Sequence, residues 1–241
     1  MYRRFLTRNQ KLETRNYVML EAGVRYINEV FETPRVTPGQ LDRLLAEGWR
    51  HFGTYFFRYS LGLHESDIRL VIPLRIRLNT FSLSKSQRRV LRRNDDLQTE
   101  IRPVEITADV ADLFDRHKQR FKFGVPASIY DFLSDDPAHV PGETLEVNVK
   151  LHGHLAAVSY FDVGEKAVSA IYAMFDPDLS RRGLGIFTML KEIEFAIGSG
   201  KDFYYQGYSY EGHSFYDYKK RFRGSEEFDW RGNWTSSGRK V

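Results

Sequence analysis

The chain has 241 residues, 41% of them hydrophobic and 28% charged, which is enough to bury the core of one large domain or two small ones. Its formal net charge is only +4, so a strongly basic surface must be local. The sequence has no cysteine, which excludes disulfide bonds, cysteine nucleophiles and thiolate metal ligands. No apolar run approaches the roughly 20 residues of a membrane-spanning helix, and the first residues lack the apolar core of a signal peptide. We therefore expect a cytoplasmic protein.

The predicted elements of the N-terminal part are mainly helical. Residues 1–67 are expected to be mostly helix, interrupted by aromatic residues. Within them, Thr37 is the expected cap of a helix that ends near Gly48. Residues 68–78 alternate and are rich in branched side chains, which predicts a strand that Pro73 either breaks or confines to a sheet edge.

A basic segment follows at residues 84–94. Ser84 and Gln87 have the spacing of a capping box, which predicts that a helix begins here. At about 100° per residue, five cations share one arc of this helix, while Val90 and Leu91 point away from it. The cations are Lys85, Arg88, Arg89, Arg92 and Arg93. A merely solvated surface would normally include acidic residues, and none lies among these five, so we interpret the helix as one that contacts phosphates.

From residue 98 the predicted elements follow a regular order. The predicted strands are 98–104, 144–151, 155–162, 167–175 and 203–208, and the predicted helices are 109–121, 128–133 and 184–197. Strand, two helices, three antiparallel strands, helix and strand is the element order of the GCN5-related N-acyltransferase fold. We therefore predict an α+β protein with a mixed sheet and flanking helices. A GCN5-related N-acyltransferase-like domain (96–241) is expected to follow a smaller N-terminal domain (1–95) that carries the basic helix.

The turn between the predicted strand 167–175 and the predicted helix 184–197 has the residues of an anion site. Gly183 and Gly185 would let backbone N–H groups approach an anion at the helix start, where the helix dipole favours negative charge. Arg181 and Arg182 would add charge-assisted hydrogen bonds. Acyl-CoA transferases hold the pyrophosphate of their cofactor in such a turn. A plain structural turn explains the same glycines, and both interpretations stay open.

Two carboxylates stand at neighbouring strand ends. Asp162 ends one predicted strand and Asp176 the next, where a carboxylate could hold an ammonium group or take its proton. The alternative is an aspartate that initiates a turn, and Asp176, which precedes a proline, fits that alternative better.

Aromatic residues crowd the last part of the chain. Residues 204–210 contain four tyrosines, and Tyr216 and a run of cations that includes Lys219 follow. Aromatic rings interleaved with cations suit stacking on unpaired bases, although alternate tyrosines of a strand would simply belong to the core. His152 and His154 flank a glycine, and a solvated hairpin turn is favoured there over a metal site.

These segments together resemble the aminoacyl-tRNA–protein transferase family, the arginyl- and leucyl-transferases of the N-degron pathway. The basic segment, extended to Leu97, is the most specific part of the resemblance. The other matching segments are 48–53 (Gly-Trp-Arg-His-Phe-Gly), 72–76 (Ile-Pro-Leu-Arg-Ile), 155–158 (Leu-Ala-Ala-Val) with Asp162, 170–177 (Ala-Ile-Tyr-Ala-Met-Phe-Asp-Pro), Leu184-Gly185, and Gly207-Tyr208 with Tyr218-Lys219.

The resemblance implies an enzyme that moves an amino acid, arginine or leucine, from the 3′ end of a charged tRNA to the amine of an acceptor. An aminoacyl ester is already activated, so the protein need only position the amine and stabilise the oxyanion. No cofactor besides the co-substrate aminoacyl-tRNA is expected. The candidate catalytic residues are Asp162, Tyr172 and Tyr208, and the candidate substrate-binding residues are Asp176, Gln206 and Tyr216. The candidate tRNA contacts are Lys85, Arg88, Arg89, Arg92, Arg93, Asn94, Arg181, Arg182, Gly183, Gly185 and Lys219.

The chain departs from the family in one respect. Family members usually carry an N-terminal cysteine cluster that can bind an iron–sulfur centre or zinc, and here Val71, for example, stands where cysteine is common. We therefore expect no metal ligands and no membrane partner, and an acceptor that is a protein, a peptide or a small-molecule amine. The alternatives are an acetyl-CoA-dependent N-acetyltransferase, which would leave the basic helix without a role, and a non-catalytic tRNA-binding relative.

Overall fold

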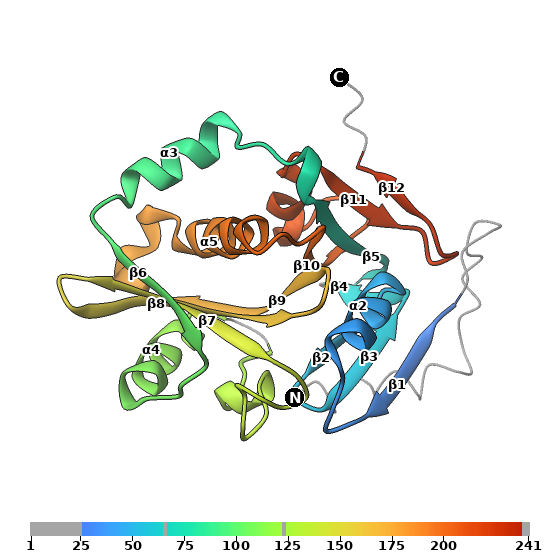
Figure 1. Ribbon diagram of the computed structural model, residues 1–241, viewed down its shortest axis with the longest axis horizontal. Helices are drawn as coiled ribbons and strands as arrows, with labels where there is room; N and C mark the ends of the chain where they lie inside the picture. The colour runs from blue at the N-terminus through green and yellow to red at the C-terminus, as the bar shows by residue number, and fades with distance from the viewer. Residues whose placement is uncertain (1–25, 65–66, 122–123, 238–241) are drawn as a thin grey trace.

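The computed structural model describes residues 26–64, 67–121 and 124–237. In this part of the chain a three-stranded sheet and a nine-stranded mixed sheet are combined with flanking helices (Figure 1). The predicted α+β class is thereby confirmed. Within the same residues no helix is long and apolar enough to cross a membrane.

The large sheet begins with β5 (Asp67–Arg77), which belongs to the N-terminal part of the chain. It pairs antiparallel with β10 (Phe203–Tyr210) on one side, and with β4 (Leu61–His64) and then β11 (Ser225–Phe228) on the other. Pro73 falls between the stretch that pairs with β4 and the stretch that pairs with β11, so its missing N–H removes no bond from either ladder. The prediction that Pro73 breaks the strand or confines it to an edge is therefore wrong. The division at residue 95 stays a prediction, although β5 shares a sheet with β10.

The strands between residues 98 and 175 follow the predicted order. β6 (Gln98–Pro103), β7 (Thr144–Leu151), β8 (His154–Val163) and β9 (Ala167–Phe175) are antiparallel neighbours, and β12 (Trp234–Ser236) extends the opposite edge beyond β11. β9 and β10 run parallel, but their pairing joins only residues 167–169 to residues 203–205. From Ala170 and Gln206 onward the two strands are no longer paired, and the place where they separate is called the opening below.

Helices cover both faces of this sheet. α5 (Leu184–Gly198) lies on one face, and α3 (Lys85–Arg93) lies over α5, whereas α4 (Ala108–Lys118) lies on the other face (Figure 1). One side of α4 is buried, at Val110, Leu113, Phe114 and His117. Short 3-10 helices complete the chain: η2 (Leu78–Thr80), η3 (Ile129–Asp131), η4 (Pro177–Arg182) and η5 (Phe215–Arg221).

The small sheet is built from the aromatic-rich N-terminal segment. β1 (Asn28–Glu32), β3 (Tyr55–Tyr59) and β2 (Arg50–Phe52) pair antiparallel in the order β1-β3-β2. The prediction of mostly helix is therefore wrong for residues 26–64, and residues 1–25 lie outside the described part. Aromatic side chains favour strands because they pack well on a pleated, half-buried surface.

One helix of the N-terminal part was predicted and is confirmed as α2 (Pro38–Ala46). Thr37 Oγ1 accepts a hydrogen bond from the N–H of Gln40, whose side chain accepts one from the N–H of Thr37. Leu41 and Leu45 of α2 are buried in a cluster that includes Tyr205 of the large sheet. This packing places β2 and its neighbours directly against the sheet, beside the point where β9 and β10 cease to pair.

Candidate functional site

The basic segment forms α3, as predicted. Ser84 Oγ accepts from the N–H of Gln87, and the Gln87 side chain accepts from the N–H of Ser84. Val90 and Leu91 pack against the core, whereas the five cations of the helix are exposed. Lys85, Arg89 and Arg92 have no hydrogen-bond or ion-pair partner in the described part of the chain. Their charges therefore face outward, where a polyanion can neutralise them.

The C-terminal end of α3 is joined to the turn before α5. Arg93 Nη1 donates to the carbonyl oxygen of Arg181 at 2.6 Å, and Asn94 Nδ2 donates to the carbonyl oxygen of Arg182 at 3.0 Å. The Arg182 guanidinium in turn donates to both carboxylate oxygens of Asp96, at 2.7 and 2.9 Å. The basic helix and the turn therefore form one surface, in which the charge of Arg182 is balanced by Asp96 while the Arg181 side chain is exposed.

The first turn of α5 faces this surface. Gly183 has a φ of 72°, ends η4 and begins α5, and no side chain caps the helix. A Cβ on Gly185 would meet no described atom closer than Phe175 Cε1, at 3.8 Å, so the space outside Gly185 is open. The N–H groups in the first turn of a helix have no intrahelical partner and attract anions. A phosphate group can therefore bind between the α3 cations and the first turn of α5.

The opening between β9 and β10 is shaped by a bulge in β10. The register shifts between Tyr205 and Gly207, so Gln206 is the extra residue, and Gly207 has a φ of 92°. Gln206 is buried, and its Nε2 donates to the carbonyl oxygen of Lys219 at 3.0 Å. Its Oε1 has no partner among the described residues. Lys219 Nζ lies 3.2 Å from the position that a Cβ on Gly207 would take, so glycine makes room there for the ammonium group.

The ammonium group of Lys219 is poised between its charged and neutral forms. The residue as a whole is half-buried, but Nζ lies 3.3 Å from the carbonyl oxygen of Tyr208 and 5.0 Å from the centre of the Tyr216 ring. Burial in this position lowers the pKa of Lys219 to about 7, and the charge of Arg50 acts in the same direction. A lysine with such a pKa can accept a proton at neutral pH.

Asp162 forms an ion pair near the point where β9 and β10 cease to pair, because it lies opposite Ser169, the last residue of β9 that pairs with β10. It is 2% exposed; its Oδ2 lies 2.8 Å from His51 Nε2, and its Oδ1 accepts from Thr144 Oγ1 at 3.0 Å. The other ring nitrogen of His51 lies 2.9 Å from the carbonyl oxygen of Gly53. Both ring nitrogens thus face oxygen acceptors, which the imidazolium form satisfies. Although burial alone would lower the pKa of His51, the Asp162 carboxylate raises it above its ordinary value.

Arg50 lies next to this pair, on the face of the sheet that the N-terminal part covers. It is 7% exposed, and its Nη2 donates to the carbonyl oxygen of Leu74 at 3.3 Å. Its guanidinium lies 5.1 Å from the centre of the Tyr205 ring and 5.9 Å from that of Tyr208. These tyrosines stand on either side of the bulge, so Arg50 is held beside the opening.

Comparisons with known sequences show which family the chain belongs to. Residues 110–229 match the family model described as arginine-tRNA-protein transferase, C terminus. The chain is 33% identical to an aspartate/glutamate leucyltransferase of Stenotrophomonas maltophilia (strain R551-3), over 78% of this chain and 76% of the relative. It is 34% identical to an aspartate/glutamate leucyltransferase of Xanthomonas campestris pv. campestris (strain B100), over 68% of this chain and 69% of the relative. The chain belongs to the aminoacyl-tRNA–protein transferase family. It is therefore an aminoacyltransferase that uses aminoacyl-tRNA as co-substrate.

Among solved structures, the crystal structure of FemX superimposes on the transferase with a TM-score of 0.50 and 12% sequence identity, over 95% of this chain and 74% of that chain. At this identity the likeness concerns the fold alone.

The other predicted site residues of the transferase have varied surroundings. The Tyr172 hydroxyl has no hydrogen-bond partner in the described part, and its ring stacks on Phe132 with the centres 4.0 Å apart. The Tyr208 hydroxyl donates to the carbonyl oxygen of Gly48 at 2.6 Å. Tyr216 is 38% exposed beside Lys219. The catalytic and binding roles predicted for these residues stay predictions.

Asp176 has the surroundings of a turn-initiating aspartate. One carboxylate oxygen accepts from the N–H of Asp178 at 3.0 Å, and the other accepts from Arg116 Nη1 at 2.7 Å. Asp176 thereby caps η4 and ties α4 to the turn before α5. Its predicted contact with substrate stays a prediction.

Two residues of the site were missed in the sequence-based candidate set. Arg50 and His51 occur in the segment Gly-Trp-Arg-His-Phe-Gly, which contributes to the family resemblance, but neither received a role. Their position in that segment was the available signal. Their partner Asp162 is 111 residues from His51 in sequence, so spacing could not connect them.

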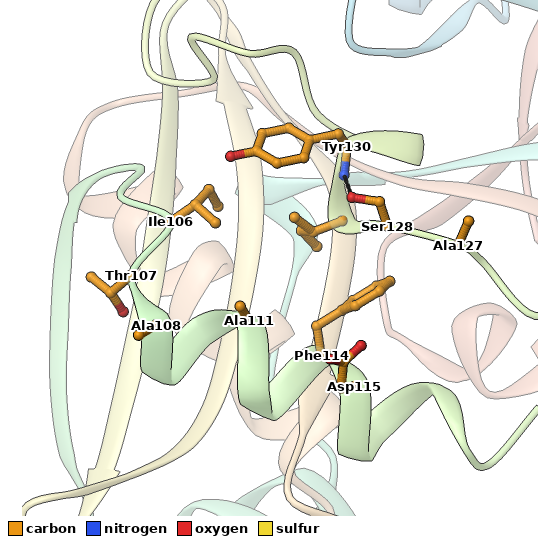
Figure 2. Close-up of a pocket in the computed structure, with 10 residues that line it drawn as sticks. Ile106, Thr107, Ala108, Ala111, Phe114, Asp115, Ala127, Ser128 and Tyr130 are labelled. Atoms are coloured by element: carbon orange, nitrogen blue, oxygen red, sulfur yellow. Dashed lines mark hydrogen bonds between the residues drawn. The ribbon is translucent and has the colours of Figure 1, made fainter.

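A separate pocket lies on the α4 side of the transferase, lined by residues other than the predicted site residues. Figure 2 shows it between α4 and the segment that ends in Tyr130, where Ile106, Ala111 and Phe114 supply apolar walls. The segment is held by a hydrogen bond from the N–H of Tyr130 to Ser128 Oγ at 3.2 Å. The volume of the pocket is about 380 Å³. Because none of the predicted catalytic or tRNA-binding residues lines it, we assign it no part in the transfer.

Proposed function

We propose that this transferase moves leucine from leucyl-tRNA to the α-amine of a protein whose first residue is aspartate or glutamate. The names of the two relatives, each an aspartate/glutamate leucyltransferase, support both the amino acid and the acceptor. The match to the arginine-tRNA-protein transferase model supports the same reaction class with a different amino acid, so arginyl-tRNA is the natural comparison.

The observation that carries the proposal is the joining of α3 to the first turn of α5. The hydrogen bonds from Arg93 to Arg181 and from Asn94 to Arg182 set the exposed cations of α3 beside an uncapped helix start. A track of phosphate-binding groups would let the acceptor end of a tRNA approach the opening between β9 and β10. A small acyl cofactor would leave the exposed cations of α3 without a role.

The chemical step needs no covalent intermediate with the protein. The acceptor amine, in its neutral form, attacks the carbonyl carbon of the aminoacyl ester; an amide bond forms and the ester bond to the tRNA ribose breaks. The amine loses a proton, and the ribose hydroxyl that leaves takes one up. An oxyanion develops on the carbonyl oxygen, and nearby donors would stabilise it.

Two groups are candidates to take the proton from the amine. Asp162 was predicted for this role, but both its oxygens are engaged by His51 and Thr144. Lys219, with a pKa of about 7, has a neutral form available at physiological pH. We propose Lys219 as the proton acceptor and Asp162 as the residue that positions His51 and the neighbouring Arg50.

The test is a transfer assay with the purified full chain. It is offered tRNA charged with labelled leucine or labelled arginine, or labelled acetyl-CoA, together with peptides that differ only in the first residue. Mass analysis then locates the added group. Leucine on the α-amine of the Asp and Glu peptides is the expected result. Arginine alone would correct the amino acid, labelling from acetyl-CoA would replace the proposal with N-acetylation, and tRNA binding without transfer would indicate a non-catalytic relative.

A further inference from the structure

Arg50 is a buried cation with unused hydrogen-bond donors. It is only 7% exposed. Its Nη2 reaches the carbonyl oxygen of Leu74, but Nε and Nη1 have no hydrogen-bond partner among the described residues. A buried charged donor left without a partner costs a few kcal/mol of stability. A protein that retains such a group at the edge of its active site has a position ready for an anionic ligand.

Two buried carboxylates of the large sheet, those of Asp162 and Glu226, are already paired with other cations. Asp162 is paired with His51, whose ring is satisfied as the imidazolium. Glu226, on the neighbouring strand β11, is bound by Arg75 and Arg77 at 2.6 and 2.8 Å. Neither carboxylate makes a hydrogen bond or ion pair with Arg50 among the described residues, although the charge of Asp162 acts on it, and Lys219 adds a second cationic group on the other side of the bulge.

The position of Arg50 relates it to the acceptor rather than to the tRNA. Arg50 lies on the face of the sheet covered by the N-terminal part, against Tyr205 and Tyr208. The α3 cations and the first turn of α5 lie on the opposite face (Figure 1). Between the two faces, at the bulge, Gln206 offers a buried carbonyl oxygen without a described donor, which is the type of group that an amine needs.

We infer that Arg50 binds the side-chain carboxylate of an acidic residue at the amino terminus of the acceptor, while Gln206 Oε1 accepts a hydrogen bond from the α-amine. The inference rests on the proposed function, because it names the residues that recognise its acceptor. A carboxylate supplies the acceptor oxygens and the negative charge that Arg50 lacks, and Arg is the side chain best suited to carboxylate recognition. Arg50 is on this account a specificity-determining residue.

The test compares Arg50→Gln and Arg50→Lys with the wild type on peptides that begin with Asp or Asn and are otherwise identical. Loss of a charge-assisted hydrogen bond predicts that kcat/KM for the Asp peptide falls by about 10- to 100-fold in Arg50→Gln. The rate on the Asn peptide, which offers Arg50 no carboxylate, should fall much less than the rate on the Asp peptide. Arg50→Lys, which keeps the charge but loses the planar donors, should retain part of the preference for Asp.

A matched control is Arg58→Gln. Arg58 belongs to the same small sheet, pairs with Glu29 at 2.6 Å and lies over the Trp49 ring, and it should leave the preference for Asp intact. Thermal melts and tRNA affinity are measured on every variant. If Arg50→Gln fails to fold, the Arg50→Lys variant decides, because its partial loss must still be confined to the acidic peptides.

Equal losses on the Asp and Asn peptides would overturn the inference, because Arg50 would then act on the ester or on the fold. An unchanged preference in both variants would also overturn it. Calorimetric binding of the Asp and Asn peptides provides a readout that does not depend on transfer. If the wild type transfers nothing but binds the Asp peptide more tightly than the Asn peptide in an Arg50-dependent way, the proposed function fails and the inference stands. If no Arg50-dependent difference in binding or transfer is found, the inference fails by itself.

Discussion

Asn94 Nδ2 donates to the carbonyl oxygen of Arg182 at 3.0 Å, across 88 residues of sequence. The bond joins the C-cap of the basic helix α3 to the turn that begins α5, and the bond from Arg93 Nη1 to the carbonyl of Arg181 lies beside it. The two predicted anion-binding segments are thereby held in one surface. The tRNA-binding prediction can therefore be restricted to certain cations of α3. Some of its cations donate hydrogen bonds to the protein backbone, and the others are available to bind phosphate.

Replacing Lys85, Arg89 and Arg92 with Gln should weaken tRNA binding without disturbing α3. These three side chains are exposed and have no partner among the described residues, whereas the side chains of Arg88 and Arg93 donate hydrogen bonds to backbone carbonyl oxygens. The slope of log affinity against log salt should flatten by about 0.7–0.9 for each lost phosphate contact. Replacing three exposed cations elsewhere (Arg35, Arg43 and Lys166) is the control. A triple variant with wild-type affinity and slope would show that α3 is not the tRNA site.

Gly185→Val should block transfer while leaving the fold intact. The new Cβ would meet Phe175 Cε1 at 3.8 Å, an ordinary contact, but it would cover the N–H groups at the start of α5 that an anion approaches. Gly198→Val, at the other end of the same helix, meets no atom within 4 Å and is the matched control. Transfer rates and melting temperatures are compared. A Gly185→Val enzyme with normal activity would indicate that the turn is purely structural.

Asp162→Asn should lower the transfer rate by about 100-fold or more, with tRNA binding near normal. It should also destabilise the protein, because the His51 imidazolium would remain buried without its counter-charge. Thr144→Val removes only the neighbouring hydrogen bond and should have a much smaller effect. Single-turnover rates of the variant at several pH values show the role of Asp162. If the transfer rate recovers at high pH, Asp162 removes a proton; if it does not recover, Asp162 positions other groups. A wild-type rate would leave Asp162 with a structural role only.

The transfer rate should rise with pH through about 7 if Lys219 accepts the amine proton. Burial lowers the pKa of Lys219 to about 7, so the neutral, proton-accepting form grows as the pH passes that value. Lys219→Gln should reduce the rate and abolish this rise. Lys220→Gln is the control, because Lys220 contacts the carbonyl oxygen of Tyr210 at 2.6 Å instead. A rise that persists in Lys219→Gln would assign it to another group.

Glu192→Gln should change the pH dependence of stability. Glu192 is buried in α5 and accepts hydrogen bonds from Ser159 and Tyr204, and burial raises its pKa from 4.5 to about 7. The folded state therefore binds the proton more tightly than the unfolded state, and stability falls as the pH rises from about 4.5 to 7. At about 1.4 kcal/mol for each pH unit, the loss is on the order of 3 kcal/mol. Urea unfolding at pH 5 and pH 8 should show this loss in the wild type and not in Glu192→Gln.

Short-range signals made two helix starts and most of the second half of the chain predictable. The capping box of Ser84 and Gln87 and the cap at Thr37 form as predicted, because a cap depends on residues three positions apart. The strands from 144 to 175 and the helix that follows Gly183 lie where alternation and glycine placed them. The aromatic segment of residues 50–59 was misjudged. Gly53, with a φ of 53°, turns the chain between β2 and β3, but a single glycine also occurs inside helical patterns, so it did not distinguish two short strands from a helix.

The sequence by itself determined the class of fold, the basic helix and the family, since each depends on local patterns or on segments compared one at a time. The tertiary structure alone decided the contents of the site. It brings His51 to Asp162 and sets Arg50 against Tyr205 and Tyr208. Buried ion pairs and cation–ring contacts form between residues that the folding of different strands brings together, and they have no fixed spacing in sequence. For the same reason, only the fold shows that Arg182 is balanced by Asp96, while Nε and Nη1 of Arg50 have no hydrogen-bond partner among the residues that the structure describes.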